Sequence, residues 1–142
     1  MSRAEGQQIL RDAKKAGKAY ASTSVESEHF QNYVADQVYS ADLDDLAETK
    51  KEALRHARNM LIDLKSEMDR NLDFRDVIKE AGVGHTFDAY GEGYTQKIYG
   101  ITAQDIYDTF WDGIREVLGR KNMENWLADE ILFRANERRE QK

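Results

Sequence analysis

The chain has 142 residues, with no cysteine and no proline, and its 27 acidic and 21 basic side chains give a net charge of −6. The lack of cysteine excludes a disulfide framework, a thiolate nucleophile and a cysteine metal site. Proline breaks helix interiors, so its absence favours helix. We therefore expect a mainly α-helical single domain over residues 1–142. It would be a compact bundle of about six helices with one long central helix and a single β-hairpin near 85–99.

The cellular location can be addressed from hydropathy. Residues 1–24 are polar, and nowhere do 18 apolar residues follow one another. A secretory signal and a membrane-spanning helix both need a longer apolar run. The sequence therefore predicts a cytoplasmic protein with no membrane partner.

The sequence signals for the first two helices are weak. Gly6 and Gly17 each lower helix stability by about 1 kcal/mol relative to alanine, so residues 1–22 are expected to form a loosely packed N-terminal arm. Thr23 or Ser24 is expected to cap the second helix. Its apolar stripe comprises Phe30, Val34, Gln37 or Val38, and Ala41.

The third helix has the strongest periodic signal and is expected from Asp42 to Arg70. Its apolar stripe comprises Leu43, Leu46, Ala53, Leu54, Ala57, Leu61, Leu64 and Met68. Such a helix would be about 40 Å long at 1.5 Å per residue, longer than a small domain is wide. Pairing of two copies through this helix, giving a homo-oligomer, is therefore one expectation.

Short polar motifs predict the remaining helix ends. Asp73 with Asp76 opens a fourth helix that Gly82 ends, and Thr102 with Asp105 opens a fifth helix that Gly119 ends. Asn122 is expected to cap the last helix, whose apolar side chains include Trp126, Leu127, Ile131 and Ala135. A charged tail over 136–142 is expected to fray.

The segment between Gly82 and Gly100 contains five of the nine glycines and three of the seven tyrosines. Glycine tolerates backbone conformations that end regular helix, and tyrosine offers a large contact face with a polar tip. Residues 85–90 and 94–99 flank the turn Gly91-Glu92-Gly93, which predicts the β-hairpin. We expect this hairpin to take part in recognition.

Charge is distributed unevenly along the chain. Residues 25–48 contain seven acidic and no basic side chains, and residues 81–118 have a net charge of −4. Acidic surfaces steer association with basic partners, and Trp and Tyr contribute strongly where an interface excludes water. The candidate partner-binding residues are therefore Asp42, Asp44, Asp45, Glu48, Tyr90, Glu92, Tyr94, Tyr107 and Trp111.

Catalytic and metal motifs are weak. Glu26 and His29 form one Glu-x-x-His pair, the unit that di-iron bundles use twice, but no second copy exists. No nucleophile elbow, phosphate loop or dinucleotide fingerprint occurs. We therefore expect no enzymatic activity, no catalytic residue, no metal and no cofactor.

A DNA-binding alternative rests on Asp76–Val83, which resembles the first helix and turn of a repressor-type helix-turn-helix. The resemblance implies a recognition helix in the following residues, where Asp88 and Glu92 would repel phosphate. The basic side chains Arg11, Lys14, Lys15 and Lys18 could assist such a regulator.

The sequence favours a small acidic, non-enzymatic protein–protein interaction module whose partner is a protein with a basic surface. Small inhibitors encoded by phages or other mobile elements have a similar size and charge, and they occupy a basic or nucleic-acid-binding groove on a host protein. The alternatives are the helix-turn-helix-like regulator and an oligomeric structural or assembly subunit. Nucleic acid is the less favoured partner.

Overall fold

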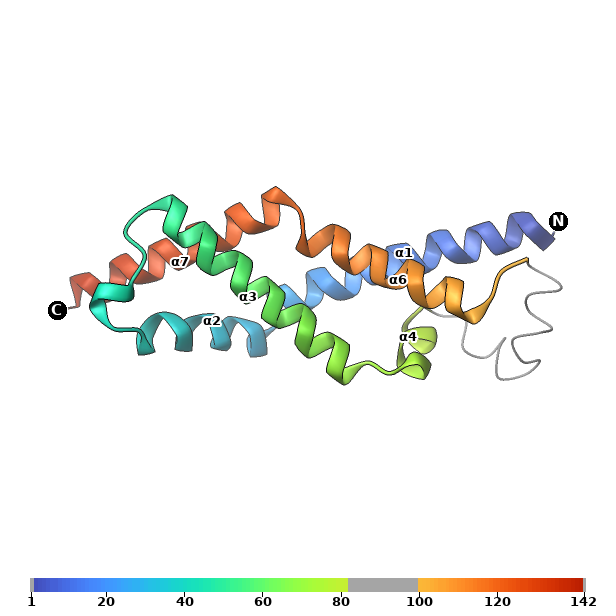
Figure 1. The fold of residues 1–142 in the computed structure, drawn as a ribbon, viewed down its shortest axis with the longest axis horizontal. Helices are drawn as coiled ribbons and strands as arrows, with labels where there is room; N and C mark the ends of the chain where they lie inside the picture. The colour runs from blue at the N-terminus through green and yellow to red at the C-terminus, as the bar shows by residue number, and fades with distance from the viewer. Residues whose placement is uncertain (1, 82–99, 142) are drawn as a thin grey trace. The chain divides into compact units, whose positions relative to one another are not determined.

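The computed structural model describes residues 2–81 and 100–141, and these residues are mainly α-helical, as predicted. The elements are α1 (Ser2–Glu26), α2 (Glu28–Ser40), the short 3-10 helix η1 (Leu43–Asp45), α3 (Lys50–Asn71), α4 (Phe74–Glu80), α6 (Ala103–Leu118) and α7 (Lys121–Glu140) (Figure 1). No strand occurs among the described residues. The β-hairpin expected near 85–99 lies outside them.

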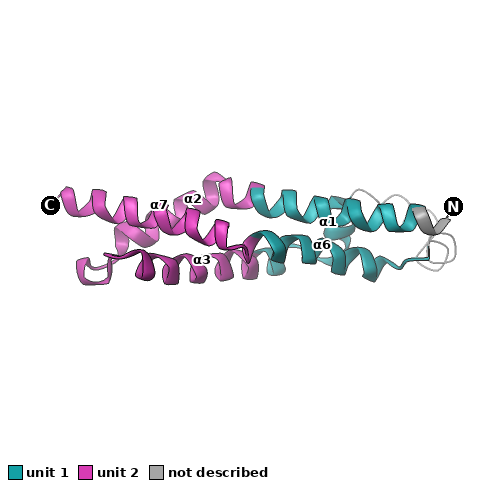
Figure 2. Cartoon of the chain, turned by 90° about the horizontal axis from the view of Figure 1, so that it is seen from above, with its two compact units in different colours: residues 1–22, 68–117 teal, residues 23–67, 118–142 magenta. Residues whose placement is uncertain are grey.

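The chain divides into two compact units (Figure 2). Unit 1 comprises residues 1–22 and 68–117, and unit 2 comprises residues 23–67 and 118–142. Unit 1 therefore contains most of α1 together with α4 and nearly all of α6. Unit 2 contains α2, η1, most of α3, and α7.

Two helix starts in unit 1 follow the sequence prediction. The Asp73 carboxylate accepts a hydrogen bond from the Asp76 amide at 2.8 Å, and the Asp76 carboxylate accepts one from the Asp73 amide at 3.2 Å. Thr102 and Asp105 make the same reciprocal pair, at 3.1 Å and 2.9 Å, before α6. Each pair satisfies two amide groups that a helix start leaves without a partner. α6 ends just before Gly119, also as predicted.

The predicted start of α2 is wrong. α1 continues through Thr23 and Ser24 to Glu26, and the N-cap of α2 is Ser27. The Ser27 hydroxyl accepts a hydrogen bond from the Phe30 amide at 3.2 Å and donates one to the Ser24 carbonyl at 2.7 Å. One side chain thus closes the first helix and opens the second.

The predicted start of α3 at Asp42 is also wrong, because the helix begins at Lys50. Thr49 accepts a hydrogen bond from the Glu52 amide at 3.2 Å, and the Glu52 carboxylate accepts one from the Thr49 hydroxyl at 3.1 Å. The hydrogen bond from Thr49 lowers the pKa of Glu52. Upstream, Leu46 is 3% exposed but Leu43 is 43% exposed. The expected apolar stripe is therefore not buried as a continuous helix face.

α7 differs from expectation at both ends. Arg120, and not Asn122, occupies the N-cap position, and the helix continues to Glu140 through residues that we expected to fray. Leu127, Ile131 and Ala135 are buried, but Trp126 is 42% exposed and so lies outside the core.

In unit 1, glycines bring the backbones of α1 and α6 into direct contact. A Cβ atom added to Gly17 would lie 2.0 Å from the Phe110 carbonyl oxygen, and one added to Gly113 would lie 2.3 Å from the Lys14 carbonyl oxygen. No side chain larger than hydrogen fits at either position. Around Gly17, the residues expected to form a loosely packed arm therefore pack closely against α6.

An ion-pair cluster flanks this contact. The Glu116 carboxylate on α6 lies 3.1 Å from Lys14 Nζ and 3.3 Å from Lys18 Nζ on α1. The hydrogen bonds from Lys14 and Lys18 lower the pKa of Glu116 from 4.5 to about 2. Electrostatic attraction therefore adds to the packing of these two helices.

Unit 2 is held together by apolar and polar contacts among α2, α3 and α7. Phe30, Val34 and Val38 of α2 are buried. Tyr33 Oη donates to Asp63 at 2.6 Å, and burial followed by this hydrogen bond raises the pKa of Tyr33 to about 12. On the other side of α3, Arg58 pairs with Glu124 of α7 at 3.1 Å.

Replacing either glycine by alanine should destabilise unit 1. The added methyl group overlaps backbone atoms, and overpacking costs about 1–3 kcal/mol, against a gain of about 1 kcal/mol in helix propensity. We expect Gly17→Ala to lower the free energy of unfolding in denaturant titrations by about 1 kcal/mol net, and Gly113→Ala to act similarly. Ala19→Gly, at an exposed site on α1, measures propensity alone and should cost about 1 kcal/mol. Stabilisation by Gly17→Ala would contradict the close contact.

The Glu116 cluster should contribute an acid-sensitive part of the stability. Because folding lowers the pKa of Glu116 from 4.5 to about 2, its contribution is complete above pH 4.5 and is lost as the pH falls through 2. The difference in melting temperature between the unmodified chain and Glu116→Gln should shrink over this range. High salt should reduce the difference at neutral pH, since the pair is exposed. A difference that stays constant from pH 6 to pH 2 would argue against the ion pair.

Candidate interaction surface

The connection between α2 and α3, residues 41–49, presents a group of exposed carboxylates. Asp42, Asp44, Asp45 and Glu48, four of the predicted partner-binding residues, are all exposed in this connection. The connection contains no basic residue. Within the described part of the chain, no ion pair neutralises any of the four carboxylates. The connection therefore holds four exposed negative charges within nine residues.

Two arginines of α7 hold this connection in place. Arg138 Nη1 donates to the Val38 carbonyl at 2.8 Å and also to the Ala41 carbonyl, and Arg139 Nη2 donates to the Ala47 carbonyl. Val38 lies in the last turn of α2, where carbonyl groups lack partners within the helix. Arg138 therefore acts as a C-terminal cap supplied by another helix, and it also places a positive charge at the negative end of the α2 dipole.

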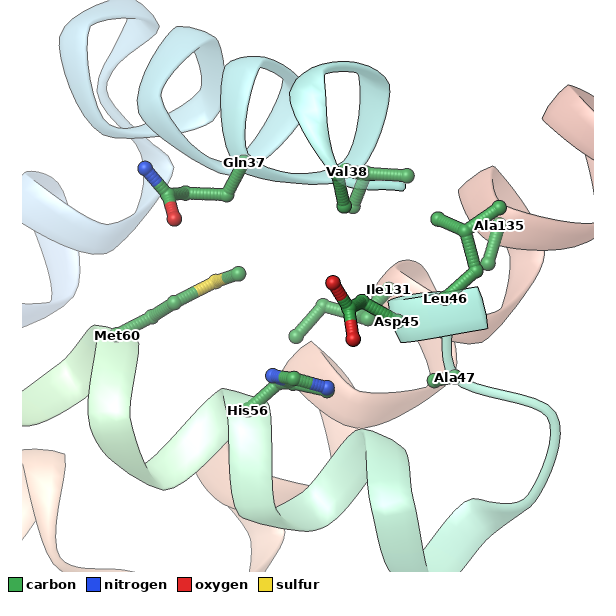
Figure 3. A pocket seen from close by; sticks show the side chains of 10 residues that line it. Gln37, Val38, Asp45, Leu46, Ala47, His56, Met60, Ile131 and Ala135 are labelled. Carbon is green, nitrogen blue, oxygen red and sulfur yellow. The ribbon is translucent and has the colours of Figure 1, made fainter. Parts of the chain in front are cut away.

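A cavity of about 130 Å³ lies beside the acidic connection (Figure 3). Its walls come from α2, the connection, α3 and α7, all within unit 2. Buried apolar side chains make up most of the lining. In Figure 3 the side chains of Asp45 and His56 lie close to each other among the lining side chains. The lining residues are Gln37, Val38, Ala41, Asp45, Leu46, Ala47, His56, Met60, Ile131 and Ala135.

The remaining predicted site residues belong to other parts of the chain. Tyr107 and Trp111 lie on α6 in unit 1, and Tyr90, Glu92 and Tyr94 lie outside the described residues. Trp111 is only 4% exposed, and its indole N–H has no hydrogen-bond partner in the described part of the chain. In its observed position Trp111 contributes to the interior, and only a rearrangement would present it to a partner.

Tyr107 is half-buried and belongs to an aromatic cluster of unit 1. Its ring stacks on Phe74 of α4 at a centroid distance of 5.3 Å and lies 6.4 Å from the Trp111 ring. Phe74 is 42% exposed and was not among the predicted site residues. This cluster joins α4 to α6.

The residues of the weaker motifs have other partners. His29 Nε2 lies 2.8 Å from Glu67 of α3, a carboxylate that the Glu-x-x-His motif does not include. Lys14 and Lys18, which the DNA-binding alternative would use, pair with Glu116. That alternative also requires residues after Ala81, most of which lie outside the described ranges. The described residues include no group of three or more histidine, aspartate or glutamate side chains arranged to hold a metal ion.

Comparisons with family models, characterised proteins and solved structures gave no match. Across residues 2–81 and 100–141, no helix combines the length and the apolar character needed to span a bilayer.

Sequence reasoning identified the acidic residues of the surface but missed the residues that shape it. His56 and Met60 lie on α3, and Arg138 and Arg139 lie about 90 residues or more after the carbonyls that they contact. The basic last turn of α7 was a visible signal, because basic side chains near helix ends often bind free carbonyls. Nothing in the local sequence showed that the carbonyls belonged to a different helix.

Loss of Arg138 should loosen the acidic connection. Hydrogen bonds from a charged donor contribute about 1.5–3 kcal/mol, so Arg138→Met should speed amide hydrogen exchange over residues 41–49 by about tenfold or more. The matched control is Lys121→Met, which removes one exposed positive charge from the same helix and should leave exchange in the connection unchanged. Equal exchange in the Arg138 variant and the unmodified chain would show that the connection does not depend on this arginine.

Proposed function

We propose that the protein is a small, acidic, non-enzymatic interaction module that binds a basic surface on a partner protein through the connection between α2 and α3. The supporting observation is the group of four exposed carboxylates, Asp42, Asp44, Asp45 and Glu48, which have no neutralising ion pair in the described structure. In the same connection, Arg138 binds the Ala41 carbonyl and Arg139 binds the Ala47 carbonyl.

The physical argument concerns preorganisation. A flexible acidic segment loses conformational entropy when it binds, whereas a connection already tied to α7 at the Ala41 and Ala47 carbonyls loses less. Unpaired carboxylates also attract a basic groove over about 10 Å at ordinary ionic strength. Such a surface suits a protein that competes with nucleic acid for a basic groove, as an inhibitor encoded by a phage or another mobile element would do.

Charge neutralisation tests this function. The basic partner is first isolated from source-cell extract on the immobilised chain. We expect the triple variant Asp42→Asn, Asp44→Asn, Asp45→Asn to bind this partner about tenfold more weakly than the unmodified chain in low salt. The difference should diminish as salt is raised. The matched control carries Asp36→Asn, Asp69→Asn and Asp108→Asn, which changes the net charge equally at exposed positions elsewhere.

Two results would contradict the proposal. Equal weakening by both triple variants would mean that net charge alone governs binding. Unchanged affinity and unchanged salt dependence in the first variant would mean that the connection does not contact the partner. A sequence-selective gel shift with DNA would instead favour the regulator alternative.

A further inference from the structure

The cavity beside the acidic connection has a size that restricts its occupant. Its volume is about 130 Å³, whereas pockets for drug-sized ligands and cofactors span about 300–1,000 Å³. A buried apolar cavity of about 150 Å³ is known to accept benzene, which has six heavy atoms. The cavity is therefore too small for a nucleotide and suits one side chain of four to six heavy atoms.

The chemistry of the walls restricts the occupant further. Val38, Met60 and Ile131 are buried and belong to three different helices, so the interior of the cavity is apolar. Gln37 and Asp45 are exposed members of the lining and His56 is half-buried, so the polar groups stand at the rim. A charged tip placed at the apolar floor would lose its hydration without a partner. An aliphatic side chain has no charge to desolvate, so it is compatible with the apolar floor.

The surroundings indicate which residues flank that side chain. Asp45 lines the rim, and Asp42, Asp44 and Glu48 belong to the same connection. A chain segment that places one side chain in the cavity passes close to Asp45, so a basic neighbour would pair with that carboxylate and an acidic neighbour would be repelled. Apolar anchors in fitted pockets, surrounded by polar contacts that exclude water, contribute most of the energy of many interfaces.

We infer that the cavity is the anchor pocket of the interaction surface and that it receives one leucine-like aliphatic side chain from a lysine- or arginine-rich segment of the partner protein. This inference rests on the proposed function and adds to it the sequence chemistry of the segment that is recognised: one aliphatic residue with basic residues nearby in the sequence.

The test uses the unmodified chain and synthetic peptides. The probe is a short peptide of lysine and glycine with a single leucine at its centre, and the comparison peptide has alanine in place of the leucine. Methyl NMR signals of Val38, Met60 and Ile131 report directly on the cavity. We expect the leucine peptide to shift these signals at about 5 mM or below, and the alanine peptide to bind about tenfold more weakly.

Variants at the rim distinguish the effect of the rim charge on peptide binding from the effect of the net charge of the chain. Asp45→Asn alters an exposed side chain, so folding should be retained. The variant should bind the leucine peptide with about threefold lower affinity. Asp36→Asn, at an exposed position of α2 outside the cavity, should leave the affinity within experimental error. A third peptide with glutamate in place of every lysine should produce no shift of the three methyl signals.

Each remaining outcome overturns the inference. If both basic peptides bind equally and the cavity signals do not move, the acidic surface still binds basic partners, but the cavity does not anchor an aliphatic side chain. If no peptide binds at about 5 mM, the cavity has no affinity for a basic segment. If the three signals instead shift with protein concentration in the absence of peptide, a second copy of the chain occupies the cavity.

Discussion

The hydrogen bonds from Arg138 and Arg139 to three backbone carbonyls are the interaction on which the candidate surface depends. They satisfy the end of α2, set the path of residues 41–49 and thereby place Asp45 at the rim of the cavity. A guanidinium group suits this task because its several donors lie in a fixed plane and can bind more than one carbonyl. Without these bonds, η1 and the burial of Leu46 and Ala47 would be left to hold the acidic connection against its own charge repulsion.

Parts of the fold set by short-range chemistry could be predicted from the sequence. The starts of α4 and α6 are fixed by pairs of side chains three residues apart, Asp73 with Asp76 and Thr102 with Asp105, so the local sequence contains all the necessary information. The start of α3 was missed although Thr49 and Glu52 form the same kind of pair. The apolar spacing of Leu43 and Leu46 suggested a helix that began earlier, and only the exposure of Leu43 shows otherwise.

Features that depend on distant parts of the chain could not be predicted. Gly17 was interpreted as a weak point of a helix because its propensity is poor, but its function in the fold is to let α6 approach α1, which requires Phe110 to be known as its neighbour. The same limit applies to the candidate site. The carboxylates could be identified from composition, whereas the cavity needs Met60 and Ile131 to meet across three helices. The burial of Trp111, a predicted contact residue, likewise depends on packing that the local sequence does not show.

Carboxyl labelling of the folded protein in extract from its source cells tests most directly whether the acidic connection is a recognition surface. A carbodiimide and a small amine modify accessible carboxylates, and mass spectrometry locates them. Relative to the purified chain, we expect labelling of Asp42, Asp44, Asp45 and Glu48 to fall in low-salt extract and to recover in high salt, while Asp36 and Asp69 label equally throughout. Unchanged labelling of the connection, or an equal decrease at Asp36 and Asp69, would contradict the account.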